Sequence, residues 1–460
     1  MIEIVSIDTP ALGDRSYLAT DGEVALVIDP QRDIDRVLAV ASERDVTITH
    51  VLETHIHNDY LTGGLALAGQ TGAVYCVNAA DPVAFDRTPV SDGDLVEVGP
   101  SMRVRVIATP GHTFTHLSYA LSDAATGKLV AVFTGGSLLY GSTGRPDLLG
   151  PDHKATLAAA QYASAQRLAS LPDDTPVCPT HGFGSFCSAT QTSGTASTIG
   201  QEKRFNPALT LDEERYVAEL LAGLDAYPAY YAHMGPANTA GPGAAELTPP
   251  AEADAATIAA RIADGEWVVD LRSRRAFAAG HVPGSLGFEH GNDFTNYVGW
   301  LIPWGTPLTL LGESPDQVSA AQLDLVRIGI DRLAGAASGT AQEWAGDRPL
   351  ATLRVADFAD LATVRHHREV SVLDVRRALE WEDGHLDGAL HIPLQELQAR
   401  MGELPAAEIW VHCASGYRSS IAASLLQAAG HDVVAIDDDV ARAAAAGVIT
   451  LTTDHERQVA

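Results

Sequence analysis

Cysteine and long apolar stretches are both scarce in this chain of 460 residues. Its four cysteines, Cys76, Cys178, Cys187 and Cys413, form no CxxC pair and no regular framework, which argues against a disulfide scaffold. No apolar stretch approaches the ~18–20 residues of a membrane span. The N-terminus carries acids where a secretory signal would carry basic residues. We therefore expect a soluble, cytoplasmic protein with no membrane partner.

Basic residues are also few. Lys and Arg together number 30 against 59 Asp and Glu, so the formal net charge is −29. The resulting field repels nucleic acid and anionic lipid, and we predict neither as a partner. Small anions are not excluded, because they need only a local cluster of Arg side chains or backbone N–H groups.

The length and composition of the chain indicate several domains. A chain of 460 residues that is 46% hydrophobic has material for two to four cores. The stretch 235–254 is rich in Pro, Gly and Ala without periodicity, which is typical of a linker. We predict an N-terminal domain at 1–235, a linker at 236–254, and two further domains at 255–345 and 353–455.

Beyond the linker, one pattern occurs twice, at 267–285 and at 372–389. Each occurrence is a short apolar strand ending in Asp-x-Arg, then a short helix, then Gly-His-x-x-Gly and a small residue. The spacing of roughly a hundred residues is far longer than a solenoid repeat. We therefore predict two copies of one α/β domain with a parallel sheet, the first copy at 255–345 and the second copy at 353–455.

The second copy contains a candidate nucleophile between a strand and a helix. The apolar strand 409–412 ends at Cys413, and a helix is predicted over 419–429. At a helix N-terminus, backbone N–H groups and the helix dipole favour an anion, so a thiolate is stabilised there. Arg418 adds a positive charge, and Gly416 lets the loop curl so that its amides point toward the sulfur.

The first copy lacks this nucleophile. Its corresponding strand, 308–311, is followed by Gly-Glu-Ser-Pro-Asp-Gln and no cysteine. We predict that the first copy is inactive and serves as a spacer or docking surface.

With its Cys-to-Arg loop, Asp-x-Arg and Gly-His elements, the second copy resembles the rhodanese family over about 355–440. The resemblance implies a sulfurtransferase in which Cys413 takes sulfane sulfur from thiosulfate or a persulfide and carries it as a persulfide. Arg418, Gly416 and the loop amides would bind the anion. A phosphatase with a related loop is the alternative, but phosphatase relatives carry a longer loop than the six residues found here.

Four histidines of the N-terminal domain follow predicted strands. His55 and His57 belong to an HxHxD pattern, His112 lies in Thr-Pro-Gly-His-Thr, and His181 lies in Pro-Thr-His-Gly. A single histidine is usually a surface or core residue, but four at strand ends predict a metal site.

These histidines resemble those of the metallo-β-lactamase fold, which implies an αββα architecture for residues 1–235. The motifs Phe-Thr-Gly-Gly, Gly-Arg-Pro-Asp and Glu-Lys-Arg-Phe-Asn-Pro narrow the resemblance to the persulfide dioxygenase branch. That branch uses a mononuclear metal, Fe(II) rather than Zn(II), and includes fusions to an inactive and an active rhodanese domain. Arg145 and Arg204 match its motif positions near the substrate.

Two positions depart from that pattern. Tyr60 replaces a histidine of the general motif, and Gly136 replaces the carboxylate ligand expected after Phe-Thr-Gly. His55 and His112 are the matching ligands that remain. Three arrangements are open: His57 completes a three-histidine site; Asp59, His181, a water or the substrate fills the gap; or metal binding is lost.

We therefore expect an enzyme of sulfur metabolism that couples sulfur transfer at Cys413 to a metal-dependent persulfide dioxygenase-like domain. Its partners would be low-molecular-weight persulfides, thiols or thiosulfate, and a homo-oligomer is possible. Two alternatives stay open for the N-terminal domain. One is a one-metal, glyoxalase II-like thioester hydrolase, and the other is a non-catalytic binding domain.

Overall fold

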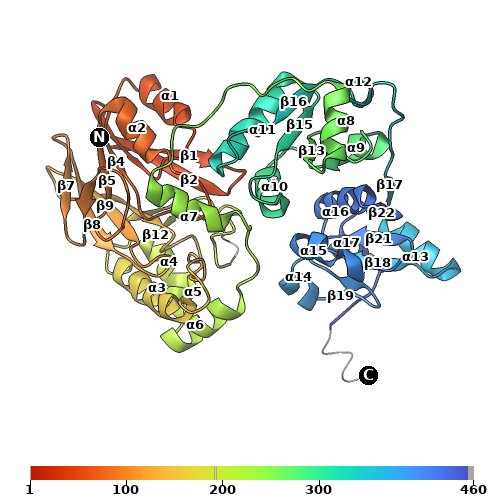
Figure 1. Ribbon diagram of the computed structural model, residues 1–460. Helices are drawn as coiled ribbons and strands as arrows, with labels where there is room; N and C mark the ends of the chain where they lie inside the picture. The colour runs from red at the N-terminus through yellow and green to blue at the C-terminus, as the bar shows by residue number, and fades with distance from the viewer. Residues whose placement is uncertain (1, 191, 193, 454–460) are drawn as a thin grey trace. The chain divides into compact units, whose positions relative to one another are not determined.

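The computed structural model describes residues 2–190, 192 and 194–453 (Figure 1). The chain divides into two compact units. The first comprises Met1–Glu246 and Leu323–Gly329, and the second comprises Leu247–Gln322 and Ile330–Ala460. Within the described residues, no helix is long and apolar enough to cross a membrane.

The first unit contains two six-stranded sheets. The first sheet has the order β1 (Glu3–Thr9), β2 (Asp14–Thr20), β3 (Val24–Ile28), β4 (Thr47–Leu52), β5 (Val74–Asn78) and β6 (Thr88–Val90). The second has the order β12 (Ser197–Thr198), β11 (Pro176–Pro179), β10 (Leu129–Gly135), β9 (Leu117–Asp123), β8 (Met102–Ala108) and β7 (Leu95–Val98).

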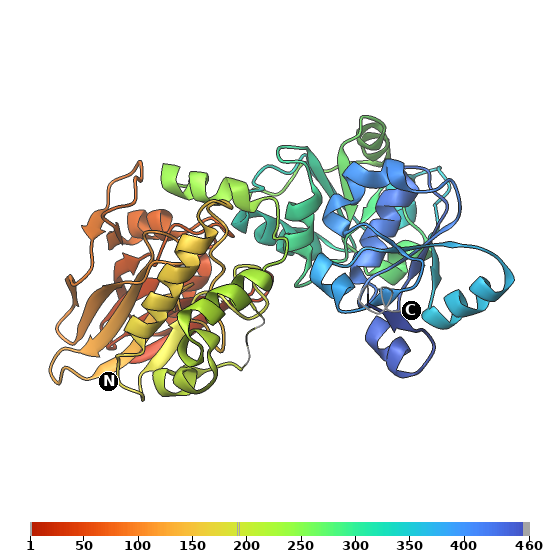
Figure 2. The same cartoon turned by 90° about the horizontal axis from the view of Figure 1, so that it is seen from below.

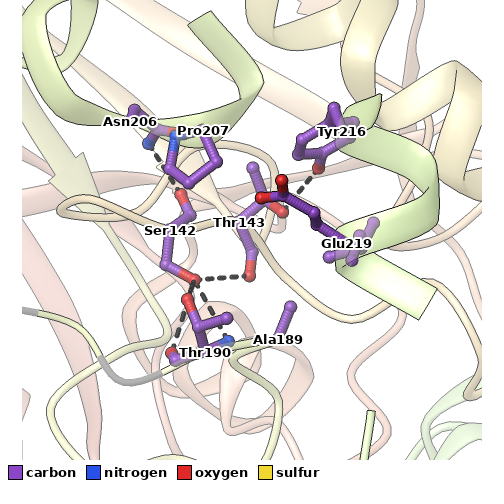
Figure 3. Close-up of a pocket in the computed structure, with 9 residues that line it drawn as sticks. Ser142, Thr143, Ala189, Thr190, Asn206, Pro207, Tyr216 and Glu219 are labelled. Atoms are coloured by element: carbon purple, nitrogen blue, oxygen red, sulfur yellow. Dashed lines mark hydrogen bonds between the residues drawn. The ribbon is translucent and has the colours of Figure 1, made fainter. Parts of the chain in front are cut away.

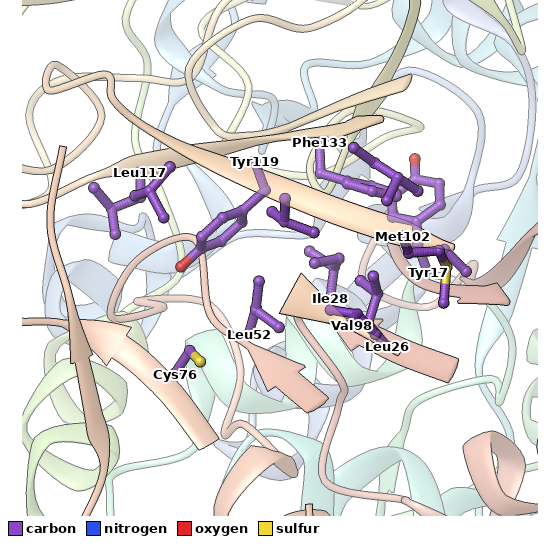
Figure 4. Close-up of a cluster of buried hydrophobic side chains, with 14 of the residues drawn as sticks. Tyr17, Leu26, Ile28, Leu52, Cys76, Val98, Met102, Leu117, Tyr119 and Phe133 are labelled. Carbon is purple, nitrogen blue, oxygen red and sulfur yellow. The ribbon is translucent and has the colours of Figure 1, made fainter. Parts of the chain in front are cut away.

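Both sheets bury one face in a common core, drawn in Figure 4. Along β8, Met102, Val104 and Val106 are buried, whereas Arg103 and Arg105 between them are not. This period of two is what a strand with one buried face requires. Leu26 of the first sheet and Phe133 of the second belong to the same buried cluster, so the core joins the sheets face to face.

Helices cover the outer faces (Figure 1). The apolar side of α1 (Asp35–Glu43) and α2 (Gly64–Thr71) packs with the outer side chains of the first sheet. The second sheet is covered by α3 (Lys154–Leu168), α4 (Ile199–Phe205), α5 (Pro207–Thr210) and α6 (Glu213–Ala222). Figure 2 looks onto this second layer, in yellow to light green. The predicted αββα fold is confirmed.

The predicted linker is only partly without regular structure. Helix α7 (Tyr231–Ala240) extends into it, despite Pro236 inside the helix. No helix or strand is assigned from there until α8 begins at Ala255, where Asp254 caps it by accepting a hydrogen bond from the Thr257 N–H.

The first copy is built on a four-stranded parallel sheet with the order β14 (Leu286–Gly287), β13 (Trp267–Asp270), β15 (Leu308–Gly312) and β16 (Gly335–Ser338). Its helices are α8 (Ala255–Ala263), α9 (Arg274–Ala279), α10 (Phe294–Leu301), α11 (Pro315–Arg327) and α12 (Ala341–Ala345).

The second copy has a five-stranded parallel sheet with the order β20 (Leu390–His391), β18 (Ser371–Asp374), β21 (Ile409–His412), β22 (Val433–Ile436) and β17 (Arg354–Ala356). A short pair joins β19 (His385–Leu386) and β23 (Leu451–Thr452). Its helices are α13 (Phe358–His367), α14 (Ala378–Glu382), α15 (Leu397–Arg400), α16 (Tyr417–Ala428) and α17 (Val440–Ala445), with 3-10 turns at Leu394–Glu396 and Met401–Glu403.

Strands that match in sequence occupy matching places in the two sheets, from β14 and β20 through β16 and β22. The Asp-x-Arg motif has the same structural role in both copies. Asp270 and Arg272 form a buried ion pair at 2.6 Å, and so do Asp374 and Arg376. In each copy the arginine also donates to the backbone oxygen of the glycine in the Gly-His motif, at 2.8 Å. In both copies the arginine of the Asp-x-Arg motif therefore links the end of its strand to the Gly-His turn.

Candidate functional site

The four histidines predicted to bind metal lie in the loops that directly follow β4, β8 and β11, and these loops come together in the first unit. The centroid of the His55 ring lies 4.1 Å from that of His57, 4.8 Å from that of His112 and 5.2 Å from that of His181. All four side chains are buried. Sequence motifs far apart in the chain are therefore brought to one point, as the strand-end positions predict.

Two of the predicted ligands have one ring nitrogen fixed by a neighbour. Nδ1 of His55 lies 2.9 Å from the Thr54 hydroxyl, and Nδ1 of His112 lies 2.9 Å from the backbone oxygen of Arg145. Nε2 of His112 is buried and has no hydrogen-bond partner. Burial lowers the pKa of His112 to about 3, so its imidazole is neutral. An oriented, neutral imidazole with a free nitrogen is what a metal ligand requires.

His57 is oriented by carboxylates. Its Nε2 lies 3.3 Å from Glu53 Oε2, 3.4 Å from Asp29 Oδ1 and 3.0 Å from the Tyr60 hydroxyl. Burial alone would lower the pKa of His57, but Asp29 and Glu53 raise it to about 9. Its Nδ1 is buried without a partner. Tyr60 therefore contacts the nitrogen of His57 that the carboxylates hold and leaves the other nitrogen free.

His181 belongs to a second charged group. Its Nδ1 lies 3.0 Å from Asp14 Oδ1 and 3.2 Å from Asp59 Oδ2, and its Nε2 lies 3.2 Å from Nε2 of His55. Burial opposes the charge, but Asp59 and Asp14 raise the pKa of His181 to about 10. His181 thus bridges the histidine group and this pair of carboxylates.

The position of the missing carboxylate is closed by its neighbours. A Cβ atom on Gly136 would lie 2.3 Å from Cδ2 of His112, and one on Gly144 would lie 2.7 Å from Nδ1 of the same ring. A side chain at 136 would therefore have to displace His112. The ring fills the space that an aspartate would need.

The two arginines predicted to bind substrate differ in their surroundings. The Arg145 guanidinium donates to both oxygens of Asp147, at 2.7 and 2.8 Å, and to the backbone oxygen of Asp225 at 2.6 Å. Arg204 is exposed on α4. A nearby pocket of about 180 Å³ (Figure 3) is lined by neutral side chains and Glu219, and by neither arginine. Substrate binding by these arginines stays a prediction.

In the second unit, Cys413 follows β21 directly, and α16 begins at Tyr417, two residues earlier than predicted. The Gly416 N–H donates to Cys413 Sγ at 3.2 Å. Gly416 has a φ of +97°, and a Cβ there would lie 2.2 Å from Asp437 Oδ1. Glycine is therefore required at this position both by the backbone and by space. The loop turns an amide toward the sulfur, as an anion site requires.

Arg418 has a partner that sequence reasoning missed. Its two terminal nitrogens donate to the two carboxylate oxygens of Glu380, at 2.6 and 2.7 Å. Glu380 lies on α14, six residues after Asp374. The matching residue of the first copy is Ala276, and Gln317 stands where Arg418 would be. Both members of the pair are thus absent from the copy that has no cysteine.

Sequence reasoning also missed two neighbours of the histidine group. His116 is buried, and its ring centroid lies 4.9 Å from that of His55. Its Nε2 accepts the Gly136 N–H at 3.0 Å, so His116 supports the loop. Cys187 offers its sulfur within 4.8 Å of ligand atoms of His112 and His181. The only sequence signal for either was proximity to a histidine motif.

Two family models match the chain. Residues 11–181 match the metallo-beta-lactamase superfamily and residues 357–442 match the rhodanese-like domain. A hydroxyacylglutathione hydrolase from Rhodobacter capsulatus is 31% identical over 218 residues, covering 42% of this chain and 80% of that protein. The chain belongs to the metallo-beta-lactamase superfamily. Its superfamily domain is followed by a rhodanese-like domain, as predicted.

Other relatives include a second hydroxyacylglutathione hydrolase and a dioxygenase. A hydroxyacylglutathione hydrolase from Polaromonas sp. is 34% identical over 162 residues, which cover 35% of this chain and 57% of that protein's length. The mitochondrial persulfide dioxygenase ETHE1 of Homo sapiens is 28% identical over 220 residues, covering 47% and 77%. A metallo-beta-lactamase structure from Staphylococcus aureus has a TM-score of 0.66 and 29% identity, covering 74% and 99%. The superfamily domain is thus related both to hydrolases and to a dioxygenase.

The superfamily implies a bound metal, and the residues present fit one. His57 and His112 each keep a buried nitrogen without a partner, and His55 presents Nε2 toward His181. Asp29, Glu53 and the Arg145 backbone hold the opposite nitrogens of His57 and His112. Ligand atoms of His55, His57 and His181 lie within 4.8 Å of one another, and His112 groups instead with His181 and Cys187. That His55, His57 and His112 form the ligand set stays a prediction.

Proposed function

We propose that this chain is an enzyme of sulfur metabolism that transfers persulfide sulfur through Cys413. The observation that supports this most directly is the position of Cys413 Sγ, 3.2 Å from the Gly416 N–H between β21 and α16. An anionic sulfur is stabilised where backbone amides and a helix N-terminus converge.

The transfer consists of two nucleophilic displacements at sulfur. The Cys413 thiolate attacks the outer sulfur of a persulfide, forming a new S–S bond as the donor thiolate leaves. An acceptor thiolate then attacks the outer sulfur of the Cys413 persulfide, and the Cys413 thiolate leaves. The loop amides hold the negative charge on sulfur in both steps. Thiosulfate serves as donor in the same way, with sulfite as the leaving group.

For the first unit we propose a persulfide dioxygenase-like activity with one metal ion, Fe(II) in preference to Zn(II). His55, His57 and His112 would hold the ion, which would supply a Lewis-acidic centre with positions left for substrate. Two features favour one metal over two. Tyr60 is engaged with His57, and Gly136 offers no carboxylate.

The carboxylates around the histidines orient the imidazole rings. Asp29 and Glu53 contact His57, and Asp14 and Asp59 contact His181, so each ring is fixed before any ligand arrives. All of these side chains are buried, which excludes bulk water from the group. Fusion of the two activities in one chain would raise the local concentration of a shared persulfide or thiosulfate.

A second function is favoured by the similarity to hydroxyacylglutathione hydrolases. It is hydrolysis of a thioester by one zinc ion in the same histidine group, with sulfur transfer at Cys413 unchanged. A first unit that only binds a persulfide carrier is the third arrangement.

Metal analysis of protein purified without oxygen separates these functions. We expect stoichiometric iron together with O2 uptake that depends on glutathione persulfide. Bound zinc together with thioesterase activity would instead assign the hydrolase function to the first unit. An empty site with sulfur transfer intact would leave the first unit as a binding domain.

A further inference from the structure

The histidine group has no carboxylate at the position the resemblance assigns to one, yet a cysteine sulfur lies beside it. The ligand atoms of His112, His181 and Cys187 all lie within 4.8 Å of one another. Imidazoles supply no negative charge to a metal ion, and an ion in a buried site is costly unless anionic groups offset its charge. A thiolate would offset part of that charge.

The backbone holds the Cys187 loop against His112. The Arg145 N–H donates to the Cys187 oxygen at 2.8 Å, and the Arg145 oxygen bonds to Nδ1 of His112 at 2.9 Å. Gly144 and Ser188 form an antiparallel bridge beside this contact. One residue, Arg145, therefore fixes both the histidine ring and the cysteine loop.

An unpartnered ring nitrogen in this group points to a ligand. Nε2 of His112 is buried without a hydrogen-bond partner, and Cys187 beside it is fully buried and in no disulfide. The Gly136 position is closed, because a Cβ there would lie 2.3 Å from the His112 ring. Asp59 is the competing carboxylate: its Oδ2 lies 3.2 Å from His181 Nδ1, and neither of its oxygens has a hydrogen-bond partner. Only the cysteine would bring sulfur to the metal, so a sulfur-specific readout separates the two donors.

We propose that Cys187 is the anionic ligand of the metal centre and replaces the missing carboxylate at Gly136. This assignment rests on the proposed metal centre in the first unit. Soft thiolate and imidazole donors together suit zinc, cobalt and iron, and binding releases the thiol proton to solvent.

Cobalt(II) titration of the metal-free full chain tests the ligand without any assay of activity. We expect one cobalt ion per chain, with an intense near-ultraviolet band from thiolate-to-cobalt charge transfer. Cys187→Ser should remove the band and weaken cobalt binding by about tenfold to a hundredfold. Cys76→Ser, Cys178→Ser and Cys413→Ser are matched controls and should keep the band.

Two further measurements give a result even if Cys187→Ser fails to fold. Cys187→Asp should bind cobalt with near-native affinity but without the band. X-ray absorption of the unmodified zinc-loaded chain should show one sulfur at about 2.3 Å. Cobalt bound without a thiolate band, or a band that survives Cys187→Ser, would overturn Cys187 as ligand and leave the metal centre standing. No bound cobalt would overturn the metal centre itself.

Discussion

The two copies of the second unit have the same framework but different loops. Both keep the buried Asp-x-Arg pair at 2.6 Å and the same order of strands. Only the second copy has Cys413, the Gly416 turn and the ion pair of Arg418 with Glu380. The shared Asp-x-Arg pair thus supports the fold, and the residues found only in the second copy form the proposed sulfur site. The comparison separates structural from functional residues within one chain.

The largest expected effect is the loss of the nucleophile. Cys413→Ser should lower sulfur transfer from thiosulfate or persulfide by more than about a thousandfold, because no other residue of the loop can form the persulfide. Sulfur release from labelled donor measures it. Residual transfer near the wild-type rate would show that the first copy or another cysteine carries sulfur.

The next effect concerns the turn that aims the amide at the sulfur. Gly416→Ala forces a non-glycine residue to φ +97° and places a Cβ 2.2 Å from Asp437 Oδ1. We expect sulfur transfer to fall about a hundredfold, since small displacements in a site have effects of that size. Gly430→Ala is the control: its φ is +90°, with nothing within 4 Å of the added Cβ. Equal losses in both variants would assign the effect to backbone strain alone.

A smaller effect is expected at the ion pair missing from the first copy. Glu380→Gln removes the carboxylate that neutralises Arg418. The doubly charged donor thiosulfate should therefore react with a higher kcat/KM. Because a partly exposed ion pair contributes at most about 1 kcal/mol, kcat/KM for thiosulfate should rise about twofold to fivefold relative to a persulfide. Glu382→Gln, exposed on the same helix, should change neither. A parallel fall for both donors would mean that Glu380 only positions Arg418.

The smallest effect is on stability in acid. Burial raises the pKa of Glu380, but Arg418 holds it at about 2, below its ordinary value of 4.5. The stabilisation from this depressed pKa is present above pH 4.5 and is lost as the pH falls toward 2. Urea unfolding at about pH 7 and about pH 3 should therefore show a smaller loss for Glu380→Gln than for the wild type. Equal losses of unfolding free energy in the two proteins would show that the ion pair of Glu380 with Arg418 does not stabilise the fold.

Local motifs in the sequence were enough to predict the αββα layers, the repeated α/β domain and the placement of Cys413 between strand and helix. These features depend on short stretches whose chemistry and periodicity are visible in the chain. The linker at 236–254 stays a prediction, and its first residues belong to α7, which contains Pro236. A composition rich in Pro and Gly does not by itself prevent a helix.

The remaining contacts join residues that are distant in sequence. Glu380 contacts Arg418, and Asp29 contacts His57, because the sheets bring these separate stretches of chain together. Cys187 approaches His112 because the Arg145 backbone connects their loops. A single sequence has no spacing rule for such pairs, so they became visible only in the folded chain.

The most direct test of the account is the site of sulfur attachment. The full chain is treated with glutathione persulfide, its free thiols are alkylated, and the digested peptides are weighed by mass spectrometry. We predict one added sulfur atom on the peptide that contains Cys413, removed by an acceptor thiol and absent from Cys413→Ser. Sulfur added to another cysteine, or to none, would contradict the assignment of Cys413 as the sulfur carrier.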